Sequence, residues 1–149
     1  MAGPVHLVRR FMGALSRAEP LDVDVDWVGT KLLSGEMQLW MAMPVHDRRH
    51  SIQVARRYEL LTGSMATRDE LAAALLHDVG KTASSLGLTG RVAATLVGPR
   101  GRRFREYHEH EAIGASMCRT AGSSTTTVSM IEGTGDARTR DLLRVADEI

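Results

Sequence analysis

The sequence predicts an all-α fold, an orthogonal bundle of six to eight short helices. Apolar residues recur at intervals of three and four through most of the chain, which is the period of helices with one buried face. Residues that end helices, such as Pro20, Gly63 and Gly133, stand between these segments. Its 149 residues fit a single domain of ordinary size.

The first half of the chain contains three predicted helices and one segment that the pattern leaves open. Residues 4–18 are predicted to form an amphipathic helix that ends before Pro20, because the residue before a proline avoids the helical region. In residues 21–30 apolar and acidic side chains alternate, which fits either a short strand or a linker with inward-pointing side chains. Residues 34–43, with Ser34 as a candidate N-cap, and residues 47–62, which stop at Gly63, form the next helices.

The second half begins with a strong helix start. Thr67 and Glu70 form a capping box, in which each side chain satisfies a backbone amide at the start of the helix. The helix that follows, residues 69–79, is apolar on all sides, so we expect it to be buried at the centre of the bundle. Further helices are predicted at residues 92–97, where a short helix precedes a loop, and at residues 109–120, 125–132 and 138–148.

Composition narrows the classes of partner. The net charge is +1 and aromatic residues make up 4%, which is unlike a general nucleic-acid or membrane-surface binder. The single cysteine, Cys118, excludes an intrachain disulfide and a paired-cysteine metal site. No apolar run reaches the roughly 18 residues of a membrane span. These features favour a globular cytoplasmic protein with no membrane partner.

The strongest chemical signal is the pair His77-Asp78 at the end of the apolar helix. Two ionisable groups are costly there unless something binds them, and a divalent cation would do so. Imidazole and carboxylate ligands together suit zinc, manganese, iron, cobalt or nickel. Candidates for the remaining ligands are polar residues on other predicted helices: His50, His108, His110 and Asp147.

The order of these residues resembles the HD superfamily of metal-dependent phosphohydrolases, whose signature H…HD…D lies on a bundle of helices. The run from Leu75 to Lys81, ending His-Asp-Val-Gly-Lys, is similar to the HD-x-G-K form of many bacterial members. The run from His110 to Ala115 resembles their H-x-x-x-G-A segment, and the run that ends at Asp147 resembles their last A-D motif. The resemblance covers residues 46–149 and implies a single HD domain over 1–149, with residues 1–45 as N-terminal helices packed on it.

The resemblance implies specific roles. Metal binding would fall to four residues: His50, His77, Asp78 and Asp147. Catalysis would involve Asp78, which would also orient a metal-bound water, and Lys81, which would contact a phosphate oxygen or the leaving group. Substrate binding would involve Arg48, Arg49 and His110. The expected cofactor is one divalent ion, with manganese, cobalt, nickel, iron, zinc and magnesium not distinguished. The expected activity is hydrolysis of a phosphomonoester of a nucleotide or similar small metabolite.

Several departures from the family keep other readings open. Two-metal members carry a further histidine after the H-x-x-x-G-A segment, and residues 128–135 contain none. Glu132 or Asp136 could take the place of this histidine as a ligand of a second ion. The stronger expectation is that the protein binds no second ion. The elements typical of cyclic dinucleotide phosphodiesterases and of guanosine tetraphosphate hydrolases are missing. The alternative is a non-catalytic, metal-stabilised regulatory or protein-interaction module, and a di-iron oxygenase is a minor third reading. The arginines of residues 100–105 fit a phosphate-binding flap, although a solvated basic loop is the commoner explanation.

Overall fold

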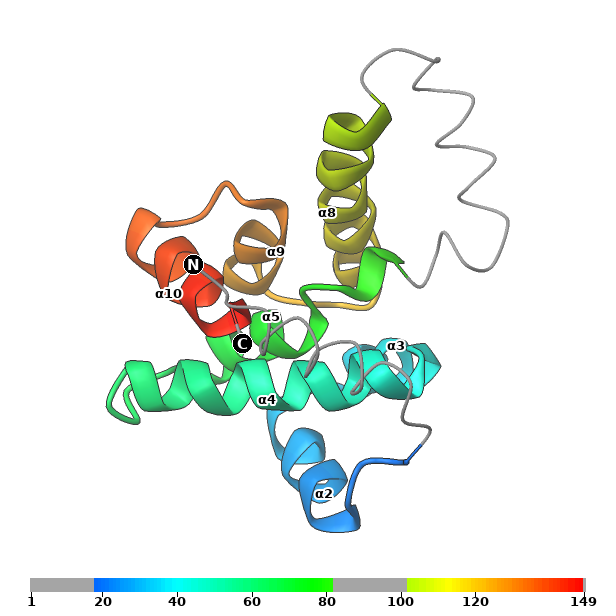
Figure 1. Cartoon of the computed structure of the whole chain (residues 1–149), viewed down its shortest axis with the longest axis vertical. Coiled ribbons are helices and arrows are strands. Elements are labelled where there is room, and N and C mark those ends of the chain that lie inside the picture. The colour runs from blue at the N-terminus through cyan, green and yellow to red at the C-terminus, as the bar shows by residue number, and fades with distance from the viewer. Residues whose placement is uncertain (1–17, 82–101, 149) are drawn as a thin grey trace, which may run out of the picture.

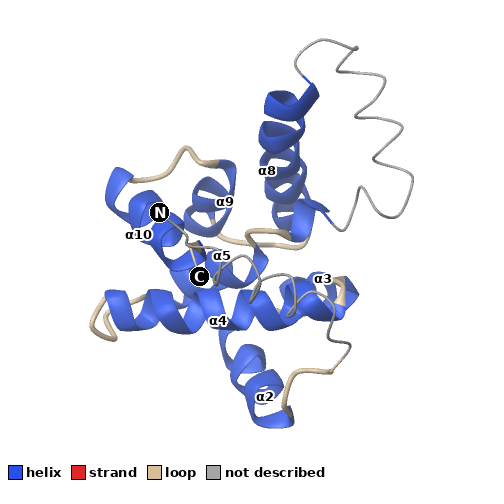
Figure 2. Ribbon diagram, viewed as in Figure 1, coloured by secondary structure: helices blue, strands red, loops and turns tan. Residues whose placement is uncertain are grey.

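The computed structural model describes residues 18–81 and 102–148, with side chains described for 18–81 and 109–148. All regular secondary structure in these ranges is helical (Figure 2), which confirms the predicted all-α class. Seven helices are described there: α2 (Asp22–Lys31), α3 (Ser34–Ala42), α4 (Val45–Leu61), α5 (Arg68–Leu76), α8 (Arg102–Thr120), α9 (Thr125–Glu132) and α10 (Ala137–Asp147).

Helix α5 forms the centre of the bundle. It packs against α2, α3, α4 and α9, and every residue from Leu71 to Leu76 is buried. Helix α4 crosses in front of α5, and α8 stands steeply to α4 (Figure 1) and packs on α9. Helix α10 packs on α4, which brings the end of the chain back to the middle of the molecule. This arrangement confirms both the expected central helix and the orthogonal bundle.

The helix boundaries follow local signals that were visible in the sequence. The Glu70 amide donates to Thr67 Oγ1 at 3.2 Å, and the Thr67 amide donates to Glu70 Oε2 at 2.8 Å, which confirms the capping box. Gly63 has a φ of +61° and Gly133 a φ of +80°, values that favour glycine where a helix stops. Both predicted stop positions are therefore confirmed.

The expectation of a strand or linker at residues 21–30 is wrong, because this segment is the helix α2. The alternation hides a helical stripe: Val25, Val28 and Leu32 recur at intervals of three and four and pack into the core. Val23, which the alternation groups with them, is 67% exposed. Asp22 lies in the first turn, where a negative charge is stabilised by the helix dipole.

Three other boundaries differ from the prediction. Helix α3 is capped from Leu33 rather than Ser34, because the Glu36 carboxylate accepts the Leu33 amide at 2.7 Å. Helix α5 ends at Leu76, so it does not continue through the His77-Asp78 pair. Helix α8 begins at Arg102, since its first turns are rich in arginine and glutamate, which favour helices. The predicted helices at 92–97 and over most of 4–18 lie outside the described residues.

Candidate metal centre

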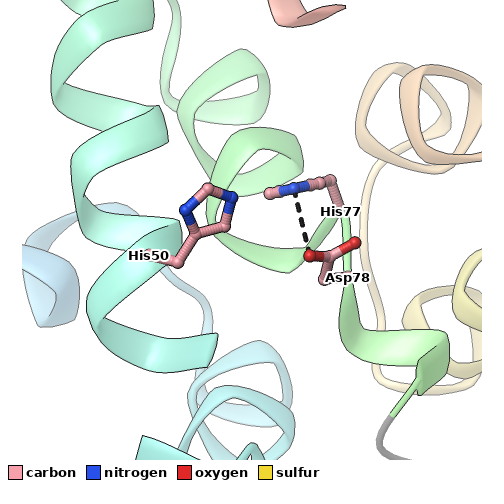
Figure 3. Close-up of side chains that lie close together, drawn as sticks. All are labelled: His50, His77 and Asp78. Carbon is pink, nitrogen blue, oxygen red and sulfur yellow. Dashed lines mark ion pairs between the residues drawn. The ribbon is translucent and has the colours of Figure 1, made fainter. Parts of the chain in front are cut away.

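Side chains from two neighbouring helices converge on one point. His50 lies in the second turn of α4, while His77 is the C-cap residue of α5 and Asp78 follows it. Figure 3 shows the two imidazole rings turned toward each other, with the Asp78 carboxylate beside His77. One ligand atom of each side chain lies within 4.8 Å of the others, so the group can hold a metal ion. The carbonyl end of α5, which carries partial negative charge, adds to the attraction for a cation.

Asp147, the last residue of α10, lies against both histidines. Its Oδ1 is 2.8 Å from His50 Nε2 and 3.2 Å from His77 Nε2, so one carboxylate oxygen contacts both rings. The chain returns to this point after 97 residues, because α10 packs on α4. Asp147 therefore contacts two members of the His50–His77–Asp78 group without itself belonging to it, and the role of all four residues as ligands stays a prediction.

The orientation of the His77 ring is set by a backbone carbonyl. Nδ1 lies 2.7 Å from the carbonyl oxygen of Ala74 and donates its proton to it. This hydrogen bond satisfies one of the carbonyls that the end of α5 leaves without a helical partner. It also directs Nε2 toward His50 and Asp147. A hydrogen bond of this kind on the other ring nitrogen is typical of histidines that bind metals.

The electrostatics of the group favour a cation. Burial alone would lower the pKa of His77, but the hydrogen bond to Asp147 and the charges of Asp78 and Asp147 raise that pKa above its ordinary value. Burial would raise the pKa of Asp147, but the hydrogen bonds and charges of His50 and His77 hold it well below its usual range. Positive charge on the His77 imidazole is therefore stabilised, and a proton and a metal ion compete for its Nε2.

Metal affinity is expected to rise with pH. Because the pKa of His77 is raised above 6.5, its imidazole stays protonated above that pH in the metal-free protein. The proton has to leave before Nε2 can bind a metal, so affinity should climb as pH rises through the raised pKa and then level off. Calorimetric titrations with Mn²⁺ from about pH 5.5 to 8.5, in buffers of different ionisation enthalpy, measure both affinity and proton release. An affinity independent of pH would contradict this competition.

Asp78 links the candidate metal group to a lysine. Its Oδ2 lies 3.5 Å from His77 Nε2, and its Oδ1 lies 3.0 Å from the Lys81 ammonium. The two carboxylate oxygens thus face a potential metal ligand and a cation. The Lys81 side chain is 52% exposed, so its ammonium can also reach a molecule that approaches from solvent.

Sequence reasoning missed Asp47 as part of this site. It precedes His50 by three positions on α4 and therefore lies on the same face of the helix. Its side chain is only 18% exposed and lies 3.2 Å from His46 Nε2. Burial raises the pKa of Asp47, as does the charge of Asp78, while His46, Lys81 and His50 act in the opposite direction. The spacing Asp47-x-x-His50 was the available signal.

Arg48, predicted to bind substrate, has a clear structural role. The residue is buried. Its Nε donates to the carbonyl of Met43 at 3.2 Å, and its guanidinium pairs with Glu19 at 3.0 Å. The guanidinium also lies 5.6 Å from the ring of Trp40, in cation–π range. These contacts join the start of α4 to α3, a function that the sequence did not reveal.

The other predicted contacts remain predictions. Arg49 is half-buried one position before His50, and His110 is half-buried on α8. His110 is not part of the group that can hold a metal among the described side chains. The two acids considered for a second ion are engaged elsewhere: Glu132 lies 3.8 Å from Arg119, and Asp136 caps α10. The side chains of His108 and of residues 100–105 lie outside the described part of the chain.

The family model of the HD domain matches residues 48–141. The chain belongs to the HD domain family. The matched region includes His50, the His77-Asp78 pair and His110, and it ends before Asp147. HD domains are generally metal-dependent hydrolases that act on phosphoesters, in agreement with the His50–His77–Asp78 group. No curated protein and no solved structure matches the chain. In the part of this HD domain protein that the structure describes, no helix is long and apolar enough to cross a membrane.

Removal of the metal is expected to loosen α10. Leu143 and Ala146 are the buried residues of this helix, so apolar packing holds it weakly. Asp147 adds a polar tie to α4 and α5, and a metal shared with His50 and His77 would strengthen that tie. We expect chelation to lower the melting temperature and to speed amide exchange in residues 138–148 more than in α5. Equal exchange in metal-loaded and stripped protein would show that the helix docks without the ion.

Proposed function

We propose that the protein is a divalent-metal-dependent phosphohydrolase that releases phosphate from a small phosphomonoester, such as a nucleotide or a similar metabolite. The observation that carries the proposal is the position of Asp78 between His77 and the Lys81 ammonium. A group that can hold a cation thereby lies next to a second positive charge. Phosphoryl transfer needs such paired positive charges, because negative charge is spread over several oxygens in its transition state.

In this mechanism each side chain has a defined task. A divalent ion, when bound, supplies the Lewis acidity that polarises a phosphoryl oxygen and activates water. His50 and His77 would hold the ion through Nε2, and the Asp147 carboxylate, whose pKa lies well below its usual range, would stay ionised beside them. Asp78 accepts a hydrogen bond from the attacking water and orients it. Lys81 donates to a phosphoryl oxygen or to the leaving group, since its ammonium is exposed beside Asp78.

One observation favours a second candidate, a metal-stabilised regulatory or interaction module without turnover. Glu132 and Asp136, the acids that stand near the missing second-site histidine, have other partners. Within the described side chains, the residues that can hold a metal form a single group, His50, His77 and Asp78. A mononuclear site is compatible with hydrolysis, but it is also what a purely structural ion would need.

A phosphate-release screen separates the two candidates. The protein is stripped with chelator, reloaded separately with manganese, cobalt, nickel, iron, zinc or magnesium, and incubated with nucleoside monophosphates, sugar phosphates and p-nitrophenyl phosphate. Metal-dependent phosphate release from one substrate class would support the hydrolase. A bound ion with no turnover across the screen would favour the regulatory module. Two iron atoms per chain would instead direct the search to oxygenase chemistry.

A further inference from the structure

Two glycines form a close backbone contact beside the candidate metal centre. Gly80 lies two residues after Asp78, in the tight turn of residues 77–81 that follows α5, and Gly114 lies within α8; both are buried. A methyl group on Gly80 would lie 1.9 Å from the carbonyl oxygen of His110 and 2.9 Å from the amide nitrogen of Gly114. The turn and α8 therefore touch backbone to backbone, and no side chain fits between them.

The contact is tight from the side of α8 as well. A methyl group on Gly114 would lie 3.2 Å from the amide nitrogen of Gly80 and 3.4 Å from Val79 Cγ1 and Ile131 Cγ2. At such distances the neighbours have to move by a few tenths of an ångström. The neighbour on one side is the backbone of the turn itself, so the displacement is transmitted directly to that turn.

This turn carries both charged groups of the proposed catalytic pair. The Lys81 amide donates to the carbonyl of Asp78 at 3.0 Å, and the two side chains pair at 3.0 Å. Val79 and Gly80 lie between these two residues, and Gly80 is the one that touches the backbone of α8. A shift of Gly80 therefore moves the Asp78 carboxylate relative to His50, which belongs to a different helix.

We propose that Gly114 is a positioning residue, which sets the place of Asp78 and Lys81 through its contact with Gly80. The absence of a side chain at Gly114 lets α8 approach the turn closely enough to hold the carboxylate next to His50 and His77. The metal-related part of this inference rests on the proposed function, since it treats Asp78 as a ligand. Its structural part, the position of the turn, does not.

The test compares Gly114→Ala with Gly29→Ala. Both glycines lie within helices, but a methyl group on Gly29 meets nothing within 4 Å. Each variant is titrated with Co²⁺, whose visible absorption reports ligand geometry. We expect Gly114→Ala to bind cobalt about tenfold more weakly than the wild type and to show an altered visible spectrum. Tenfold is the lower end of the loss in affinity that usually follows when a residue supporting a metal ligand is changed. Gly29→Ala should match the wild type. Wild-type affinity and spectrum in Gly114→Ala would overturn the proposal.

A double variant separates positioning from general destabilisation. Val79→Ala removes the carbon that would lie 3.4 Å from the new methyl group of Gly114→Ala. Since Val79 is fully buried, the double variant should be less stable than either single change. The contact of 3.2 Å with the Gly80 amide nitrogen remains, so we expect the double variant to keep an altered cobalt spectrum, while Val79→Ala alone keeps that of the wild type although it is destabilised. An equally altered spectrum in Val79→Ala would show that Gly114 acts through stability alone. If Gly114→Ala does not fold, this volume-matched double variant is compared directly with Val79→Ala, and equal spectra would count against the proposal.

A measurement without metal distinguishes failure of this inference from failure of the proposed function. If the wild type binds no cobalt, the proposed function is wrong. The positioning inference is then decided by amide exchange of Lys81, whose amide donates to the carbonyl of Asp78. Faster exchange of this amide in Gly114→Ala than in Gly29→Ala would support the inference. Equal exchange in the two variants would overturn it.

Discussion

Replacing Asp147 by asparagine is expected to remove the metal and the phosphohydrolase activity together. The carboxylate contacts Nε2 of both His50 and His77, and an amide lacks the negative charge that a divalent ion needs. Loss of an outer partner of a metal ligand costs about 10–100-fold in affinity or activity, and loss of a ligand itself should exceed that. Elemental analysis after dialysis gives the metal content, and kcat/KM on the substrate identified by the screen gives the activity.

The matched control is Asp141→Asn, an exposed aspartate on the same helix. It changes the net charge by the same amount without touching the histidines, so it should keep full metal content. If Asp147→Asn also retains one ion per chain, Asp147 is not a ligand and the ion is held by His50, His77 and Asp78. The comparison is informative because Asp147 lies beyond the residues that the family model matches.

The parts of the fold that could be predicted depend on local signals. Thr67 and Glu70 define a helix start through their own two hydrogen bonds, and Gly63 defines a stop through its positive φ. These interactions span only a few residues, so the sequence contains them in full. Helix α2 was missed because alternation and helical periodicity overlap over ten residues. The burial of Val28, which decides between them, depends on distant helices.

In the candidate site, too, the sequence revealed the residues with a local signal and did not reveal those whose role depends on packing between helices. His77 and Asp78 stand together after an apolar run, which is unusual enough to attract attention in the sequence. Asp47 lies in a charged stretch that looks like an exposed helix start. Its burial and its interaction with Lys81 arise only when α4 packs against the end of α5. The role of Gly114 is also invisible in sequence, because it consists of contact with a backbone from another element.

Replacing Glu36 by glutamine is expected to cause a large loss of stability, although Glu36 lies outside the candidate metal centre. Its carboxylate is fully buried and accepts hydrogen bonds from the Leu33 amide at 2.7 Å, the Ser123 hydroxyl at 2.7 Å and the Arg68 guanidinium at 3.0 Å. Arg68 also donates to the carbonyl of Lys31. The network therefore ties α2, α3, α5 and the loop after α8 together. Burial tends to lower the pKa of Arg68, but its hydrogen bonds and ion pairs with Glu36 and Asp69 raise that pKa above its ordinary value.

Breaking a buried ion pair by removing one partner costs about 3–5 kcal/mol. The loss in Glu36→Gln should fall near the lower end, because the Arg68 side chain is 33% exposed and still pairs with Asp69. Glu132→Gln is the control, since Glu132 and Arg119 are exposed and their pair at 3.8 Å should contribute less than about 1 kcal/mol. Urea unfolding of the two variants, with unchanged slopes, compares the losses directly. Equal urea midpoints for the two variants would mean that solvent or a rearranged Arg68–Asp69 pair compensates for the lost charge of Glu36. Apolar packing alone would then hold α3 against α5.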